Sequence, residues 1–170
     1  MKFAFPHAAF MAAVILTAYP SLSTAHSGHK KTEASPPEGY NLVWSDEFNT
    51  DGLPDPTKWN YDTYRNKEGW WNAEEQYYSA NRRQNARIKN GHLIIEARKD
   101  GETLTDYPDY GGQDYSSARL YTKGIASWQY GYYEIRAKMP CGKGLWPAIW
   151  TLPEEPGDCL LYTSPSPRDS

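Results

Sequence analysis

Short stretches of alternating apolar and polar residues recur along this chain, which is the pattern of half-buried β-strands. Residues 131–139 show it best, because apolar side chains at every second position would cover one face of a strand. The same reasoning predicts an opening strand at 40–44, short strands at 59–64 and 117–122, and a late strand at 145–152. No window repeats apolar residues every 3.6 positions over three turns, so no long helix is expected.

A tight turn stands out between two of these strands. Asn90-Gly91 separates the strand-like runs 86–88 and 93–97, which predicts a type I′ β-hairpin. Segments 51–56 and 100–115 are rich in turn residues and are expected to be loops. Short strands with frequent turns predict an all-β fold, an antiparallel β-sandwich.

Composition narrows the class of protein further. The chain has 170 residues, enough for one domain with a core, and holds 7 Trp and 14 Tyr against only 4 Phe. Tyr and Trp combine an apolar ring with a polar group, a bias found in sheet cores and in carbohydrate binders alike. The formal net charge of −3 gives no bulk attraction to nucleic acid or to an anionic membrane.

The N-terminus has the features of a secretory leader. Lys2 supplies the positive charge, 8–18 is an apolar run, and small residues precede a cleavage position after Ala25. This predicts a signal peptide over 1–25 and a secreted protein, extracellular or periplasmic, with no membrane association once the leader is removed. A retained membrane anchor is the alternative. Residues 26–39 are rich in Ser, Lys, Pro and Glu, and are expected to be a flexible linker.

The segment Gly142–Pro153 carries the strongest chemical signal. In a strand, Trp146, Ala148 and Trp150 would share one face and form a flat apolar platform suited to sugar rings. Residues 159–170 then break the strand pattern with two Ser-Pro pairs. They resemble translated vector or adapter sequence, with a natural disordered tail as the alternative. A disulfide between Cys141 and Cys159 is permitted in a secreted protein but not expected, because Cys159 begins this foreign-looking tail.

Four segments together resemble the N-terminal half of the family 16 glycoside hydrolases of the laminarinase type. The match covers about 40–153, within a catalytic domain part assigned to 40–158. The fold implied is a concanavalin-like jelly roll, a curved sandwich of two antiparallel sheets whose concave face binds a polysaccharide. The segments are Leu42–Phe48, Gly69–Tyr78, Ser117–Thr122 and Tyr130–Leu152.

The resemblance implies an O-glycosyl hydrolase that acts on β-glucan, with β-1,3-glucan as the expected partner. Retaining enzymes of this kind need two carboxyl groups about 5 Å apart, one as nucleophile and one as acid/base. In the family these come from a Glu-x-Asp-x-x-Glu or Glu-x-Asp-x-Glu strand that follows the Trp-Pro-Ala-x-Trp segment. Here Glu154, Glu155, Asp158 and Asp169 do not make that spacing. We therefore expect no catalytic residue in this chain, a truncated fold and an inactive product.

The substrate-binding residues implied by the family pattern are Asn72 in the early loop, Arg119, and the cleft tryptophans Trp146 and Trp150. Each could instead have a structural role, as a turn residue, a strand cation or core rings. Glu74 fits a recurrent acidic position, with a structural hydrogen bond equally possible.

No cofactor is required by this chemistry. Some family members hold a structural Ca²⁺, which here would use backbone carbonyls around Glu47 and Gly91 and a late aspartate that this chain lacks. A non-catalytic β-glucan-recognition protein of the same fold is the alternative function, since the catalytic glutamates are absent. An unrelated structural sandwich is a third possibility.

Overall fold

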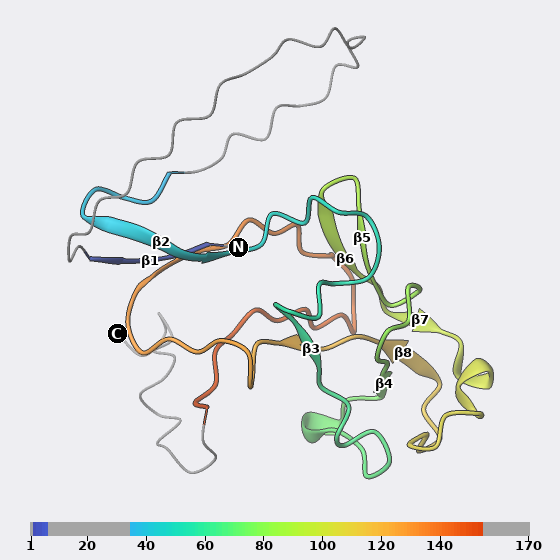
Figure 1. Ribbon diagram of the computed structural model, residues 1–170. Coiled ribbons are helices and arrows are strands. Elements are labelled where there is room, and N and C mark those ends of the chain that lie inside the picture. The colour runs from blue at the N-terminus through green and yellow to red at the C-terminus, as the bar shows by residue number, and fades with distance from the viewer. Residues whose placement is uncertain (1, 7–34, 155–170) are drawn as a thin grey trace, which may run out of the picture. The chain divides into compact units, whose positions relative to one another are not determined.

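The computed structural model describes residues 2–6 and 35–154, and these form strands and two short 3₁₀ helices (Figure 1). No helix among them is long and apolar enough to span a lipid bilayer. The chain divides into two units. Unit 1 holds the described residues up to Ser45 together with Tyr130–Ile135, and unit 2 holds Asp46–Gln129 and the described residues from Arg136 onward.

Unit 1 is a three-stranded antiparallel sheet in the order β10-β1-β2. Its central strand is β1 (Lys2–Pro6), which pairs on one side with β2 (Tyr40–Ser45) and on the other with β10 (Tyr132–Glu134) (Figure 1). The opening strand predicted at 40–44 is thus confirmed. The rings of Tyr40 and Tyr132 lie 6.1 Å apart.

The predicted leader lies partly in this sheet. Lys2–Pro6 of that leader form β1, whereas the rest of it, including Ala25, lies outside the described residues. The tail predicted at 159–170 also lies outside them, as does Cys159, while Cys141 is a free and exposed cysteine. Leader cleavage and the foreign tail therefore stay predictions.

Unit 2 contains three small sheets. In the first sheet, β3 (Asn60–Tyr61) pairs with β9 (Leu120–Tyr121). In the second, β5 (Ala86–Lys89) pairs with β6 (His92–Ile95). In the third, β8 (Tyr115–Ser117) pairs with both β4 (Gln76–Tyr78) and β7 (Arg98–Lys99). The helix η1 (Trp71–Ala73) precedes β4, and η2 (Gly101–Leu104) follows β7.

One strand pair departs from the antiparallel prediction. Strands β4 and β8 are parallel, with Tyr77 opposite Ser116. A parallel pair needs a long connection to bring the chain back to the same end. The segment from Ser79 to Asp114 supplies it, and includes β7, which pairs with β8 in the antiparallel sense.

The hairpin predicted around Asn90-Gly91 is confirmed. Lys89 lies opposite His92, so Asn90 and Gly91 form a two-residue loop between β5 and β6. Both have positive φ, 53° and 71°, as a type I′ turn requires. Local turn chemistry is sufficient to determine this element.

We expect Gly91→Ala to lower the stability of the chain by about 1 kcal/mol, because an L-residue with a Cβ is strained at this φ. Thermal unfolding followed by circular dichroism measures the effect. The matched control is Lys89→Ala, which changes an exposed neighbour in the same hairpin. Equal stability of Gly91→Ala and the wild type would contradict the left-handed turn.

Four predicted strands are wrong in extent. The strand at 59–64 is reduced to Asn60–Tyr61. The strand at 117–122 is divided, because β8 ends at Ser117 and β9 begins at Leu120, which leaves Arg119 between them. Only Tyr132–Glu134 of 131–139 is a strand, and 145–152 contains none. A strand exists only where a neighbour completes its hydrogen-bond ladder. No described residue pairs with 145–152 in this way.

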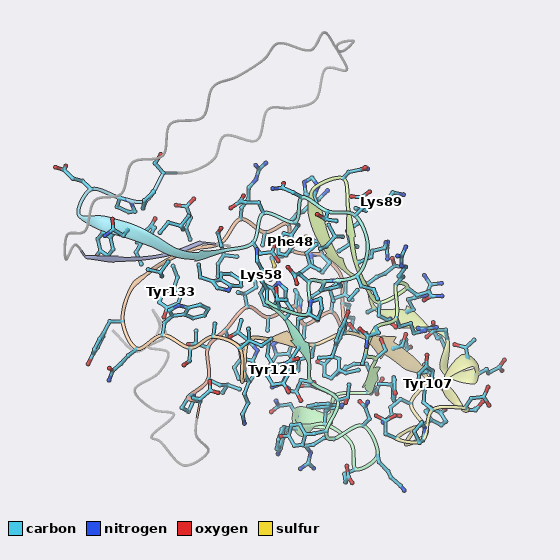
Figure 2. The ribbon with its side chains drawn as sticks, in the orientation of Figure 1. Phe48, Lys58, Lys89, Tyr107, Tyr121 and Tyr133 are labelled. Carbon is cyan, nitrogen blue, oxygen red and sulfur yellow. The ribbon has the colours of Figure 1, made fainter. Side chains whose placement is uncertain are left out.

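The apolar core of unit 2 is small and rich in aromatic rings. Phe48, labelled in Figure 2, stacks on the buried ring of Trp59 with 6.4 Å between the ring centroids. The Trp59 indole N–H donates to Asp46 at 2.8 Å. Asp46 also accepts from the backbone N–H of Phe48. This part of the first family motif therefore has a structural role. The buried apolar residues are Trp59, Trp70, Tyr77, Ala86, Ile88, Leu104 and Ala118.

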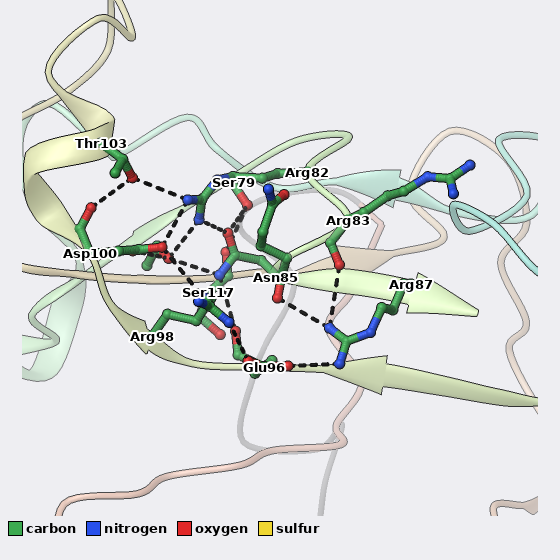
Figure 3. A network of polar contacts seen from close by, with 12 residues as sticks. Ser79, Arg82, Arg83, Asn85, Arg87, Glu96, Arg98, Asp100, Thr103 and Ser117 are labelled. Atoms are coloured by element: carbon green, nitrogen blue, oxygen red, sulfur yellow. Dashed lines mark hydrogen bonds and ion pairs between the residues drawn. The ribbon is translucent and has the colours of Figure 1, made fainter. Parts of the chain in front are cut away.

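A buried polar network ties two sheets of unit 2 together, β5-β6 and β4-β8-β7 (Figure 3). Arg82 donates to Asp100 at 2.8 Å and to Asn85 at 2.7 Å, and Asn85 donates to Ser116 and to the Glu96 carbonyl. Burial alone would raise the pKa of Asp100, but hydrogen bonds from Ser116 and Arg82 outweigh it, and the pKa is lowered. Hydrogen bonds between charged and amide groups thus connect elements of unit 2 that apolar packing would connect in a larger core.

Candidate functional site

Arg119 lies between two indole rings. Its guanidinium carbon is 5.1 Å from the ring centroid of Trp70 and 5.2 Å from that of Trp150. Trp70 is only 6% exposed, whereas Trp150 is 57% exposed. One indole therefore supports the guanidinium from inside the unit, and the other presents a ring to solvent beside it.

Asp62 holds this arginine in place. The two strands β3 and β9 are paired, and just beyond them the backbone N–H of Asp62 donates to the carbonyl of Arg119 at 2.9 Å. The Asp62 carboxylate then lies 3.1 Å from Nε of Arg119. Burial raises the pKa of Asp62, and the charge of Arg119 opposes that rise. The ion pair uses Nε, and no described residue accepts a hydrogen bond from the terminal nitrogens of Arg119.

Trp70 is itself fixed by hydrogen bonding and packing. Its indole N–H donates to the side-chain oxygen of Asn66 at 3.0 Å, and Asn66 is fully buried. Asn66 also donates to the carbonyl of Tyr78 and to Asp109. The ring of Tyr78 meets Trp70 edge to face at 4.8 Å. The inner face of the site is therefore a preorganised surface.

Glu74, a candidate from the sequence, contacts Tyr78 at the edge of the site. Its carboxylate accepts from the Tyr78 hydroxyl at 3.1 Å and from the Gln76 amide at 2.8 Å. Burial, together with the neighbouring Glu74 charge, raises the pKa of Tyr78 to about 12. Glu74 thus makes the structural hydrogen bonds that were one of its two predicted roles.

The four predicted substrate-binding residues are only partly brought together. Arg119 and Trp150 contact each other. Asn72 is exposed and has a left-handed backbone conformation, with φ 61° and ψ 22°, inside η1 next to Trp70. Trp146 is 74% exposed and shares no ring contact with another described aromatic residue. The binding roles of all four residues stay predictions.

Sequence reasoning did not single out Trp70, Asp62 or Asn66. Trp70 lies within the family segment Gly69–Tyr78, so the resemblance could have indicated it as a site residue. No sequence pattern indicates Asp62 or Asn66 as site residues. Their partners, Arg119 and Asp109, are distant in the sequence and come close only in the folded chain.

The arrangement suits binding of a neutral polyhydroxyl ligand. Open guanidinium donors can hydrogen-bond to hydroxyl groups, and the exposed indole can pack on apolar C–H faces. Among the described residues no three His, Cys, Asp or Glu side chains gather as a metal site would require. The Ca²⁺ site implied around Glu47 and Gly91 would use backbone carbonyls, so Ca²⁺ stays a prediction.

Comparison with known proteins identifies relatives, although no family model matches this chain. It is 54% identical over 115 residues to a β-glucanase of Rhodothermus marinus, an alignment that covers 68% of this chain and 37% of that protein. It is 44% identical over 123 residues to glucan endo-1,3-β-glucosidase A1 of Niallia circulans, covering 69% of this chain and 18% of that protein. The chain thus spans little more than a third of the first relative's length, and less of the second's.

A solved structure supports the same relationship. SCLam, described as a non-specific endo-β-1,3(4)-glucanase from family GH16, matches with a TM-score of 0.54 and 59% identity. The match covers 57% of this chain and 36% of that one. The all-β jelly-roll class predicted from the sequence is confirmed, and the partial coverage fits a truncated fold. This chain is therefore a relative of the family 16 glycoside hydrolases of the laminarinase type, as its four motifs predicted.

Proposed function

We propose that this chain is the glucan-binding N-terminal part of a secreted endo-β-1,3-glucanase that hydrolyses with retention of configuration. The observation that carries the proposal is the Arg119 guanidinium, which lies against Trp70 and exposed Trp150 and is held by Asp62. Relatives named as β-glucanases supply the substrate class. The partner is a β-1,3-glucan, and neither nucleic acid nor a membrane is involved.

The catalytic glutamates belong to a strand that is absent from this sequence. The chain's contribution is to bind and orient the glucan, so that a carboxylate pair supplied by the complete enzyme can flank the bond. Arg119 would hold sugar hydroxyls through its terminal nitrogens, and Trp150 would pack against a ring. Secretion rests on the leader over 1–25.

The alternative is a β-glucan-recognition protein without catalysis, favoured by the missing carboxylate pair. Both functions require the same binding site. Sequencing the complete transcript across the codons for Pro156–Cys159 separates them. A continuation with two glutamates flanking an aspartate supports the enzyme, and a continuation with substituted acids supports the recognition protein.

Binding of laminarin by the chain tests the shared part of the proposal. We expect Arg119→Lys to weaken binding about five- to tenfold, because an ammonium group cannot reproduce the planar fork that donates to paired hydroxyls. Affinity electrophoresis in gels containing laminarin measures the loss. Trp150→Ala should weaken binding about fivefold.

The matched control is Arg136→Lys, which makes the same change at an exposed arginine in the same unit. A gel with pullulan in place of laminarin controls for general sugar affinity. Wild-type chain that migrates equally in both gels would refute the proposed binding. Because Trp150 is more than half exposed, Trp150→Ala should leave thermal unfolding nearly unchanged. If Trp146→Ala weakens laminarin binding while the melting curve is unchanged, the predicted role of Trp146 is supported too.

A further inference from the structure

Two exposed aromatic rings lie beyond the Arg119 site and have no role in the function proposed above. Tyr64 is 64% exposed and Trp71 is 50% exposed, and their ring centroids are 5.8 Å apart. Large rings held at the surface in pairs commonly mark a binding surface, since core packing does not require them there. We call Tyr64, Trp71 and the adjacent Arg65 the outer aromatic cluster.

The outer aromatic cluster is held in a fixed geometry. The guanidinium carbon of Arg65 lies 4.4 Å from the ring centroid of Trp71, and its Nε donates to the Gly69 carbonyl at 3.0 Å. The backbone N–H of Gly69 returns a hydrogen bond to the Arg65 carbonyl at 2.9 Å. This closed turn limits the movement of Trp71 even though half of its surface is open. A preorganised ring loses little conformational entropy when a ligand packs on it.

The outer aromatic cluster is continuous with the Arg119 site through one residue. Trp70 meets Tyr64 edge to face at 5.5 Å and Trp71 at 6.4 Å, and it also lies 5.1 Å from the Arg119 guanidinium. Trp70 is buried, so it supports both surfaces from within. The Arg119 guanidinium and the two exposed rings are therefore separated by a single indole, and an extended ligand is of a size to contact both.

We propose that the outer aromatic cluster is an additional subsite for a β-glucan chain, occupied by sugar residues beyond those that contact Arg119 and Trp150. Tyr64 and Trp71 provide apolar faces for pyranose rings, and Arg65 provides guanidinium donors for their hydroxyls. An extended polysaccharide is the fitting occupant, because a small sugar would not reach both surfaces. This subsite rests on the glucan binding proposed above and determines how many sugar residues the chain recognises.

The subsite predicts a dependence on oligosaccharide length. We expect Trp71→Ala to weaken binding of laminarihexaose about fivefold and to leave binding of laminaribiose unchanged, because only the longer ligand reaches the outer aromatic cluster. Arg119→Lys should weaken binding of both ligands. Isothermal titration of the full 170-residue chain measures each affinity. Trp71→Phe, which keeps an aromatic ring, should restore most of the affinity for laminarihexaose.

The control variant is Tyr115→Ala, which removes another exposed ring with a cation above it, Lys99 at 5.9 Å, outside this cluster. It should not change either affinity. Unchanged laminarihexaose binding by Trp71→Ala would overturn the inference, as would an equal loss for both ligands. A wild-type chain that binds neither ligand would overturn the function proposed above, which distinguishes the two failures. Melting curves recorded beside each titration show that a loss of affinity is not a loss of folding.

Discussion

Laminarin incubated with the purified chain should release reducing ends no faster than a blank. The sequence after Trp150 holds only Glu154, Glu155, Asp158 and Asp169 as acidic residues, and none has the spacing of the family's catalytic strand. Without a nucleophile and an acid/base about 5 Å apart, the retaining mechanism cannot proceed. General acid–base assistance alone contributes about 10²–10⁴-fold, so the expected loss exceeds any effect of a binding residue.

The Rhodothermus marinus β-glucanase, assayed at the same molar concentration, is the positive control. We expect binding without hydrolysis, so that laminarin retards the chain in a gel but is not cleaved by it. Reducing-end release that copurifies with the chain, and that disappears in a Glu154→Gln or Glu155→Gln variant, would show that a carboxylate pair exists here after all.

Removing the arginine at the centre of the buried polar network should cost the most stability. Arg82 and Asp100 are mostly buried, and Arg82→Ala would remove the shortest ion pair of Asp100, which would keep only Ser116 and the longer 3.4 Å contact with Arg98. Breaking a buried ion pair on one side costs about 3–5 kcal/mol when the remaining charge has no other partner. Because Ser116 and Arg98 still contact Asp100, we expect a smaller loss here, with a melting temperature lower by roughly 5–10 °C. Differential scanning calorimetry measures the change.

Arg83→Ala is the matched control, because Arg83 is the exposed neighbour of Arg82 and its side chain makes no ion pair with a described residue. It should change stability by less than about 0.5 kcal/mol. The double variant Arg82→Ala/Asp100→Ala should be less destabilised than the sum of the single variants, since neither charge is then left alone. A loss in Arg82→Ala no larger than in Arg83→Ala would show that the network does not stabilise unit 2.

Acid should weaken the same network. The folded pKa of Asp100 lies below its ordinary value, so its contribution is complete above the unfolded pKa of about 3.9 and is lost as pH falls through the folded value.

The parts of this fold that the sequence predicts are those decided by neighbours in the chain. The hairpin depends on Asn90 and Gly91 alone, because positive φ at two adjacent positions selects the turn. The strand at 40–44 is recognisable by its own alternation. By contrast, 145–152 has a good alternating pattern but forms no strand. A strand also needs a neighbouring strand to hydrogen-bond with, and the alternating pattern does not show whether one is present.

The candidate site likewise contains some residues that the sequence predicts and others that it does not. Arg119 and Trp150 were predicted from motifs and lie together. Asp62, which holds Arg119, was not predicted, because nothing near it in the sequence indicates that β3 will pair with β9. Buried partners of this kind can be found only after the pairing of the strands is known.

The position of β1 has a consequence for the maturation of this protein. Lys2–Pro6 form the middle strand of their sheet, yet they also belong to the leader predicted over 1–25. Removal of the leader after Ala25 would take away the hydrogen-bond partner that β2 and β10 share. If the leader is cleaved, the inner edges of β2 and β10 would then be left unpaired. The uncleaved precursor and the mature chain would therefore differ in the pairing of β2 and β10.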